Sequence, residues 1–367
     1  MFAGVITFAL GEQHSLMLKQ DGSLWSTVLS LQRSVTRDVS YKFVKLISSD
    51  VVDVAAGSDF SIVLKRDSSV WTMGRNARGQ LGNGKRIGKD KFSKVETFPG
   101  AKAIVAGSAH SMVLTTEGRV WAVGWNKYGQ LGDGMMTGYK TRFFEVPIMN
   151  VVAIAAGDSH TIVLQKDGSL SATGWNFYGQ LGDGTTDDKR SFVTIMNNSN
   201  AEDIVCGSCH SIVVKADGSV WVTGSNQFGQ LGDGTTKDKI KYVQVMFSGA
   251  IAAAAGKRHS MILKQDGSVW ATGHNQHGQL GSGSIHLNYA FLTVISGGVK
   301  LIAAGGFHSM VIKQDCSIWA TGSNKNGQYG DGSSQSSTTF VRLGPLCHGA
   351  QHFTLKKHMD SSPISCN

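Results

Sequence analysis

The chain has 367 residues, with 46 glycines, only four prolines and a formal net charge of +9 at pH 7. This composition, with few helix-favouring runs, favours many short strands joined by tight turns and speaks against a helical architecture. The positive charge favours acidic partners and carries no information about the fold.

Cysteine usage and the lack of long apolar runs indicate the compartment. Five cysteines are present, an odd number, and they do not recur at equivalent positions, so we expect no disulfide framework and a reducing, intracellular compartment. The choice among cytoplasm, nucleus and organelle stays open. Residues 1–10 are apolar but lack a basic leading region, so we predict a strand there and no signal peptide. No apolar run approaches the roughly 20 residues of a membrane helix, so we expect a soluble protein without a transmembrane segment.

A repeat of about fifty residues organises the whole chain. The glycine of a Gly-x-x-His motif recurs at Gly11, Gly57, Gly107, Gly157, Gly207, Gly256 and Gly305, in steps of 46, 50, 50, 50, 49 and 49. Such a period is typical of stacked modules that cannot bury their apolar faces alone. We predict one domain over residues 1–344, built from units at about 1–50, 51–100, 101–150, 151–200, 201–249, 250–298 and 299–344. Residues 345–367 are predicted to be a C-terminal tail.

Each unit contains four strand-like runs. In the first unit, residues 1–10 supply the opening strand, but residues 28–33 depart from the long loop of the other units. In the fifth unit the runs are 203–206, 211–215, 219–223 and 241–246. The second run is apolar without alternation, which indicates a strand buried on both faces. Four short strands per unit and seven units predict an all-β, seven-bladed propeller of four-stranded antiparallel blades.

Strand direction sorts the loops. The Gly-x-x-His turns and the long loops should share one face of the ring, and the Asp-Gly hairpins and inter-unit links the other. The seventh unit ends at residues 340–343. We expect the ring to close by pairing of the two chain ends, because closure protects both strand edges.

The motifs resemble a known family. Gly207-x-x-His210-Ser211, Asp217-Gly-Ser-Val-Trp221 and the Asn-x-x-Gly-Gln-Leu-Gly-Asp-Gly run ending at Gly234 resemble the regulator-of-chromosome-condensation repeat, over about residues 5–343. The resemblance implies a seven-bladed propeller. The founding member exchanges nucleotide on a Ran-type GTPase and binds chromatin, and other members are ubiquitin-ligase modules, a UV-B photoreceptor and scaffolds. The exchange activity requires a protruding wedge, for which the even spacing from the second unit onward leaves no obvious insertion.

Several recurrent residues could suggest chemistry, and their repeat positions favour structural roles. The histidines are His14, His110, His160, His210, His259 and His308. Metal ligands must lie within about 4 Å of one another, which seven-fold related positions achieve only near the axis. We therefore predict a structural role for these histidines, with their rings bonded to loop backbone, and no metal.

Cys206-Gly-Ser-Cys209-His210 matches the attachment pattern of c-type haem. The neighbouring unit carries Ala156 and Ser159 at the two cysteine positions, so we interpret the cysteines as replacements of small residues and expect no cofactor.

The aspartates Asp133, Asp183, Asp233 and Asp331 should fix turns by accepting bonds from backbone amides. Trp125 and Trp175 are either exposed anchors or ordinary inter-blade packing, and we favour packing. No catalytic constellation is found, so we expect a non-enzyme.

The positive charge gathers after the Gly-Asp-Gly turns. This basic arc consists of Lys85, Arg86, Lys89, Lys91, Lys94, Lys140, Arg142, Lys189, Arg190, Lys237, Lys239 and Lys241. Equivalent loops should place these residues on one face over four consecutive blades, where they would bind a partner.

We predict a non-catalytic protein-interaction scaffold, as an accessory subunit of a larger assembly, whose partner has an acidic surface. A small GTPase, nucleic acid or chromatin, and anionic lipid are the other partners considered. The alternative function is a guanine-nucleotide exchange factor for a Ran-like GTPase or a chromatin-binding protein.

Overall fold

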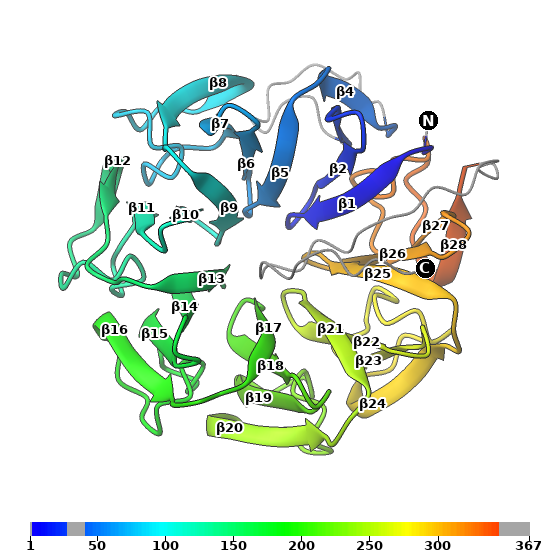
Figure 1. Ribbon diagram of the computed structural model, residues 1–367. Coiled ribbons are helices and arrows are strands. Elements are labelled where there is room, and N and C mark those ends of the chain that lie inside the picture. The colour runs from blue at the N-terminus through cyan, green and yellow to red at the C-terminus, as the bar shows by residue number, and fades with distance from the viewer. Residues whose placement is uncertain (1, 28–40, 345–367) are drawn as a thin grey trace, which may run out of the picture.

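The computed structural model describes residues 2–27 and 41–344, which form seven four-stranded antiparallel sheets arranged as the blades of a ring (Figure 1). The predicted all-β, seven-bladed propeller is therefore confirmed. The divergent loop at residues 28–33 and the predicted tail at 345–367 lie outside the described residues. Within the described part of the chain, no helix could span a bilayer.

The blades follow one another in chain order. Blade one consists of β1 (Val5–Leu10), β2 (Ser15–Lys19), β3 (Leu24–Ser26) and β4 (Val44–Ile47). Blade two consists of β5 (Val51–Ala56), β6 (Phe60–Lys65), β7 (Ser69–Gly74) and β8 (Lys89–Thr97). Blade three consists of β9 (Ala101–Ala106), β10 (His110–Thr115), β11 (Val120–Trp125) and β12 (Tyr139–Glu145). Blade four consists of β13 (Val151–Ala156), β14 (His160–Gln165), β15 (Leu170–Gly174) and β16 (Lys189–Met196). Blade five consists of β17 (Ala201–Cys206), β18 (His210–Lys215), β19 (Val220–Gly224) and β20 (Lys239–Met246). Blade six consists of β21 (Ala250–Ala255), β22 (His259–Lys264), β23 (Val269–Gly273) and β24 (Asn288–Ile295). Blade seven consists of β25 (Val299–Ala304), β26 (His308–Lys313), β27 (Ile318–Gly322) and β28 (Ser337–Leu343).

The residue types explain the radial order of the strands. The innermost strands, of which β21 is the clearest, are rich in alanine because neighbouring blades crowd together at the axis. The second strands are buried on both faces, as the unbroken apolar run Ile212 to Val214 in β18 predicts. The core is accordingly divided among the blade interfaces: Ile212 and Val222 of blade five, for example, pack in one cluster with Ile262 of blade six.

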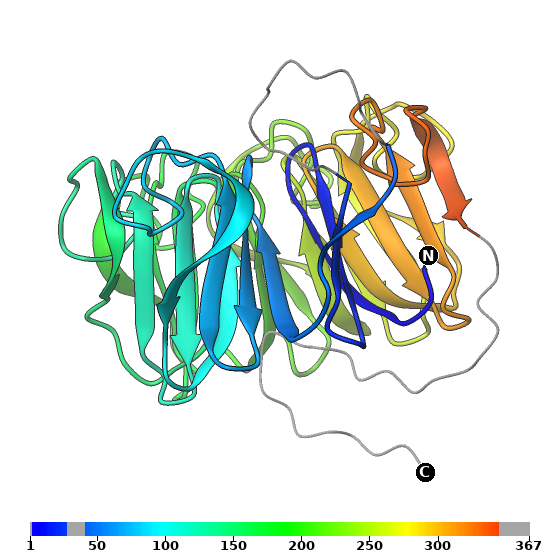
Figure 2. The same ribbon diagram turned by 90° about the horizontal axis from the view of Figure 1, so that it is seen from above.

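The strands run roughly along the ring axis, so the loops gather on two opposite faces (Figure 2). We call the face that carries the Gly-x-x-His turns and the long loops between third and fourth strands the histidine face. We call the opposite face, with the hairpins between second and third strands and the inter-blade links, the hairpin face. This is the distribution that strand alternation predicts.

The ring does not close by strand exchange, so the expectation that the two chain ends pair was wrong. β1 pairs with β2 and β28 with β27, each inside its own blade. The physical reason is that each repeat already starts with an innermost strand and ends with an outermost one. β1 and β28 therefore lie at different radii and cannot form one ladder.

A backbone clamp joins the first and last blades as it joins other neighbours. The glycine N–H that ends each Gly-Asp-Gly-type turn donates to a carbonyl at or beside the outer strand of the next blade, at 2.8–2.9 Å. The pairs are Gly84–Thr141, Gly134–Arg190, Gly184–Ile240, Gly234–Tyr289, Gly283–Thr338 and Gly332–Tyr41. The last pair connects blade seven to blade one. Beside it, Phe43 of blade one and Tyr329 of blade seven share a buried cluster that seals the ring.

Seven glycines surround the axis at the histidine face. A Cβ atom built on Gly107 would lie 2.3 Å from the carbonyl oxygen of Gly157, and one on Gly157 would lie 2.5 Å from that of Gly207. The same contact recurs around the ring and ends at Gly305, whose Cβ would meet the Gly11 oxygen at 2.8 Å. The repeat therefore requires glycine here because the blades approach one another too closely for any side chain. The residues next to these glycines line a cavity of about 100 Å³ on the axis.

Candidate interaction face

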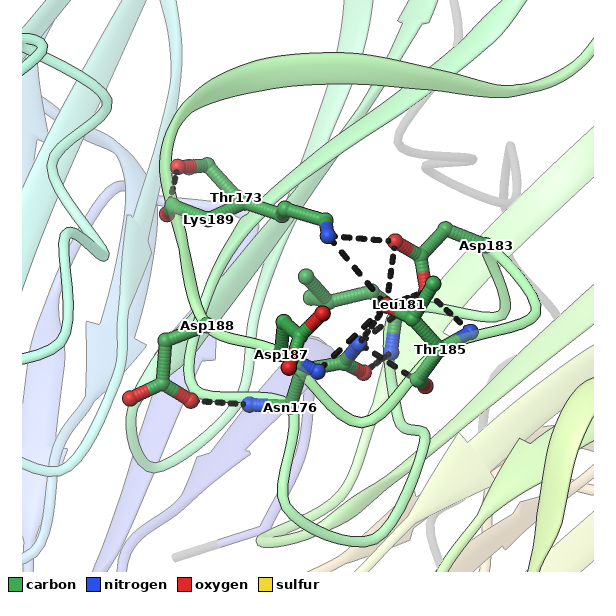
Figure 3. Close-up of polar contacts among 8 residues, drawn as sticks. All are labelled: Thr173, Asn176, Leu181, Asp183, Thr185, Asp187, Asp188 and Lys189. Carbon is green, nitrogen blue, oxygen red and sulfur yellow. Dashed lines mark hydrogen bonds and ion pairs between the residues drawn. The ribbon is translucent and has the colours of Figure 1, made fainter.

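The long loops of blades two to seven are built around one buried asparagine each. In blade four, Asn176 accepts a hydrogen bond from the Leu181 amide with its Oδ1 and donates to Asp183 and to the Thr185 carbonyl with its Nδ2 (Figure 3). Its own backbone N–H donates to Asp188 at 2.8 Å. Because the same bonds recur around Asn126 and Asn226, the loops are rigid platforms whose shape does not depend on a ligand.

The turn aspartates do what the sequence predicts. The carboxylates of Asp133, Asp183, Asp233 and Asp331 accept backbone N–H bonds from the residue two positions later, at 2.8–3.0 Å. Burial alone would raise the pKa of Asp183, but hydrogen bonds from Thr185, Lys189 and Asn176 outweigh it and lower the pKa. The Asp183 carboxylate is therefore an ionised group that fixes its turn.

Three lysines of the basic arc are used inside their own blades. Lys140, Lys189 and Lys239 are the first or second residues of outer strands and form ion pairs with Asp133, Asp183 and Asp233, at 3.3, 3.1 and 2.9 Å. All three are only half-exposed. Their charge is largely cancelled locally, so they contribute less to a partner-binding field than their number suggests.

The other arc residues remain at the surface. Lys85, Arg86, Lys89, Lys91, Lys94, Arg142, Arg190, Lys237 and Lys241 are exposed. Most of them lie at or near the starts of outer strands, so the arc follows the rim of the histidine face instead of its centre. Arg86 is oriented by the Tyr139 ring, which lies 4.4 Å from its guanidinium carbon, and by a bond to the Ala77 carbonyl.

The charge along this rim is uneven. The blade-two segment 75–91 contains six basic residues, Arg75, Arg78, Lys85, Arg86, Lys89 and Lys91, against the single acidic residue Asp90. The equivalent blade-four segment 175–190 contains two basic residues against Asp183, Asp187 and Asp188. The strongest positive sector therefore lies on blade two.

The six repeat histidines are buried, and their hydrogen bonds differ from the prediction. Their Nε2 atoms bond to a Ser or Thr hydroxyl of the next blade and not to loop backbone. The pairs are His14–Ser61, His110–Thr161, His160–Ser211, His210–Ser260, His259–Ser309 and His308–Ser15, at 2.9–3.2 Å. Sequence reasoning missed this because the partner is about fifty residues away in five pairs and at the other end of the chain for His308. The constant hydroxyl after each histidine was the available signal.

The hydroxyls fix the histidine tautomer. The Ser211 hydroxyl donates its proton to the Gln180 carbonyl at 2.7 Å, so the His160 Nε2 must be the donor in the other bond. The neutral imidazole then leaves its buried Nδ1 without a hydrogen-bond partner. Because His160 and Ser211 are both fully buried, this pair cannot act as catalytic base and nucleophile toward a substrate.

The Cys206 and Cys209 thiols do not form a disulfide and are unreactive in character. Cys206 packs in the interface cluster that contains Trp221 and Tyr242. Burial raises the pKa of both thiols to about 12, so neither is a thiolate at neutral pH. This environment fits the interpretation of small core residues replaced by cysteine.

Aromatic residues on the histidine face form a feature that the repeat pattern only partly indicated. Trp125 and Trp175 were expected to be packing residues, and they do pack across the interface of blades three and four through Tyr128. Phe177 extends this group to the surface and was not predicted. Its signal was a departure from the repeat, since Lys127, Gln227 and Gln276 hold the equivalent positions.

Comparison with known proteins agrees with this architecture. A family model described as an RCC1-like domain matches residues 2–248, and models of the regulator of chromosome condensation (RCC1) repeat match residues 250–279, 299–328 and 266–312. A comparison with curated proteins finds no match.

Solved propellers superpose over most of the chain. Human WBSCR16 has 21% identity and a TM-score of 0.74, over 84% of this chain and 87% of that chain. Yeast RCC1 (Prp20), solved with Kap60 bound, has 20% identity and a TM-score of 0.76, over 93% and 84%. Prp20p from Saccharomyces cerevisiae, in a study that also concerned its binding to Gsp1p and histones, has 20% identity and a TM-score of 0.73, over 93% and 86%. At these identities the likeness establishes a shared fold.

Proposed function

The chain belongs to the RCC1-like repeat family, and we propose that it acts as a non-catalytic protein-interaction scaffold that binds an acidic partner surface through its histidine face. The observation that supports this most is the segment 75–91, where six basic residues on the long loop and the start of β8 accompany one acidic residue, and of the six Arg75 pairs with Asp59 outside the segment. A fixed cluster of like charge raises the association rate of an oppositely charged partner and selects against a positive one. An accessory subunit of a larger assembly would use such a surface.

Rigidity supports the same role. The long loops of blades two to seven are held by hydrogen bonds to a buried asparagine and are clamped to the next blade, so little conformational entropy is lost when a partner binds. The paired lysines Lys140, Lys189 and Lys239 stabilise the loops and leave recognition to the exposed cations of blades two and five.

Removing exposed charge from blade two should weaken partner binding. In the triple variant Lys85→Gln, Lys89→Gln and Lys91→Gln, we expect about a tenfold loss of affinity for a partner identified by affinity capture from native cells, roughly 1.4 kcal/mol. The loss should shrink as salt rises from about 0.1 to 1 M, because exposed charges are screened. The thermal midpoint should not change, since all three side chains are exposed.

The control removes as much charge from elsewhere. Arg66→Gln, Lys166→Gln and Arg342→Gln change exposed residues near the hairpin face. Lys19, Lys264 and Lys313 are unsuitable controls, because their ammonium groups lie over the rings of Trp25, Trp270 and Trp319 at 4.8, 4.2 and 4.3 Å. Equal losses from the two triple variants would mean nonspecific charge and would contradict the proposal.

Nucleotide exchange remains the alternative function. The repeat spacing of 49 or 50 residues from the second unit onward is matched by blades of four strands each, so residues 41–344 contain no additional strand that could serve as a wedge. Mixing the protein with a Ran-type GTPase that carries fluorescent nucleotide separates the two functions. A scaffold leaves the release rate unchanged, whereas accelerated release would establish an exchange factor.

A further inference from the structure

Five aromatic rings form a continuous ridge on the histidine face of blades three and four. This aromatic ridge consists of Trp125, Tyr128, Trp175, Phe177 and Tyr178. Tyr128 links the blades, with ring centroids 5.4 Å from Trp125 and 5.6 Å from Trp175. Neighbouring centroids along the ridge lie 5.0–6.4 Å apart.

Packing within the protein does not account for the outer end of the ridge. Trp125, Tyr128, Trp175 and Tyr178 are half-buried, but the Phe177 side chain is 64% exposed. Its ring is nearly parallel to that of Trp175, with an interplanar angle of 15° and centroids 6.4 Å apart. An exposed phenylalanine held on a rigid loop offers a flat apolar surface to a ligand.

Cations alternate with the rings. The Arg78 guanidinium carbon lies 5.2 Å from the Trp125 ring, and the Lys127 ammonium lies 5.4 Å from the Tyr128 ring. Beyond Arg78 the ridge continues into the basic segment 75–91 of blade two. A ligand laid from blade two to blade four would meet positive charge first and stacked rings next.

The acidic groups near this track are mostly used by the protein. Asp59 pairs with Arg75 at 3.4 Å, Asp183 pairs with Lys189, and Asp188 accepts the Asn176 amide. Asp187, which is exposed, differs from these three. Within residues 41–344 its backbone N–H donates to Thr185, but its carboxylate has no such partner. The track from blade two to blade three therefore stays positive.

We propose that the aromatic ridge and the blade-two segment 75–91 together bind single-stranded nucleic acid. Phosphates would lie against Arg78, Lys85 and Lys127, and bases would stack on the ridge, with Phe177 as the outermost platform. Cationic grooves interleaved with aromatic rings are the arrangement that recognises single strands without sequence preference, because every base has two flat faces. This role goes beyond the protein-interaction function and does not rest on it.

The same surface is poorly suited to a duplex. A duplex keeps its base faces stacked inside, so the ridge would gain nothing from them, and sequence reading in the major groove requires an inserted helix or ribbon. An acidic protein would satisfy the cations but would not need five rings. The three kinds of ligand can be distinguished by probes of matched charge.

The test is fluorescence anisotropy with a labelled oligothymidine of about 15 nucleotides, a length within the site sizes of single-strand binding proteins. The protein should bind this probe, with an affinity that falls as salt rises from about 50 to 200 mM. Phe177→Ala should weaken binding by about tenfold, since removing one stacking ring has effects of that order. The control is Phe247→Ala at an inter-blade link on the hairpin face, where the side chain is 85% exposed, and it should leave binding unchanged.

Three further probes decide what the ridge recognises. An abasic oligonucleotide with the same number of phosphates, a duplex of the same length and polyglutamate should all bind more weakly, and Phe177→Ala should not affect them. Equal affinity for the abasic probe would show that charge alone is responsible and would overturn the proposal. The proposal would also be overturned if polyglutamate bound more tightly than oligothymidine and if Phe177→Ala weakened that binding. The ridge would then serve an acidic protein. Because both exposed substitutions should leave the thermal midpoint unchanged, a failure to fold is not expected to obscure the result.

Discussion

We expect the protein to unfold cooperatively as the pH falls from about 6.5 toward 5, because burial holds six histidines neutral in the fold. The pKa is lowered to about 4 for His14, His110 and His210, and to about 3 for His160, His259 and His308. Burial is the main cause, and Coulombic repulsion from neighbouring histidines adds to it for the last three. Each histidine bonds a Ser or Thr hydroxyl through its Nε2, so a second proton would have to go to the Nδ1 atom, which is buried and has no acceptor beside it.

The sign follows from where the proton binds first. In the unfolded chain the histidines take up protons below about pH 6.5, whereas in the folded chain they take up protons only at about pH 4 or 3. The stability that the neutral histidines allow is therefore fully present above pH 6.5 and is lost as the pH falls. Each histidine costs about 1.4 kcal/mol per pH unit in this window. Six of them cost roughly 8 kcal/mol by about pH 5.5, which is comparable to the stability of a whole domain. Chemical denaturation at a series of pH values measures this slope.

Two substitutions at one repeat position test the assignment. His160→Phe copies Phe60 of blade two, which is fully buried and contacts Gly57 as the histidines contact their own glycines. At about pH 8 the His160→Phe variant should have a free energy of unfolding roughly 1 kcal/mol lower, because one hydrogen bond is lost. In acid, its unfolding should take up one proton fewer than unfolding of the wild type. Phe60→His should bind one proton more, because the Ser111 hydroxyl already donates to Gln80 and can accept from a new Nε2. Stability that is flat from pH 8 to 5, or variants with the wild-type slope, would refute this account.

Alanine at an axial glycine should destabilise the ring strongly. In Gly107→Ala the new Cβ would lie 2.3 Å from the Gly157 carbonyl oxygen and 2.2 Å from the His110 ring, so blades three and four would have to separate. We expect a loss of roughly 3 kcal/mol and a fall in the thermal midpoint of about 6 to 12 °C. Scanning calorimetry would measure both.

The matched control is Gly297→Ala. Gly297 has ordinary backbone geometry, and its nearest neighbour, the Asp266 carbonyl oxygen, would lie 3.4 Å from the new Cβ. This substitution should change stability by less than about 0.5 kcal/mol. Similar effects from Gly107→Ala and Gly297→Ala would mean that close packing at the axis is not what the repeated glycine provides.

The sequence predicts those features that lie within one repeat. The four strands of the fifth unit were placed within two residues of β17, β18, β19 and β20, because apolar runs and turn residues are local signals. The roles of the turn aspartates were predicted for the same reason. Features that join repeats were missed or wrong, since the hydroxyl partners of the histidines and the Gly332–Tyr41 clamp connect residues that no local pattern relates.

The candidate site shows the same division. The repeat positions indicate that the basic residues follow the Gly-Asp-Gly turns, but the ion pairs of Lys140, Lys189 and Lys239 could not be predicted from charge alone. The recurrent interval from Asp183 to Lys189 and from Asp233 to Lys239 was the available signal. Phe177 was not predicted, because the repeat pattern identifies residues that recur. Residues that bind a partner are often those that differ between repeats.

The most direct test of the central claim is amide hydrogen exchange of the protein alone and in complex with the protein partner recovered by capture. If the histidine face is the docking surface, protection should increase in residues 75–91 and 125–142. The hairpins at residues 65–69, 165–169 and 215–219, on the opposite face, should exchange as in the free protein. Protection confined to those hairpins, with the histidine face unchanged, would contradict the account.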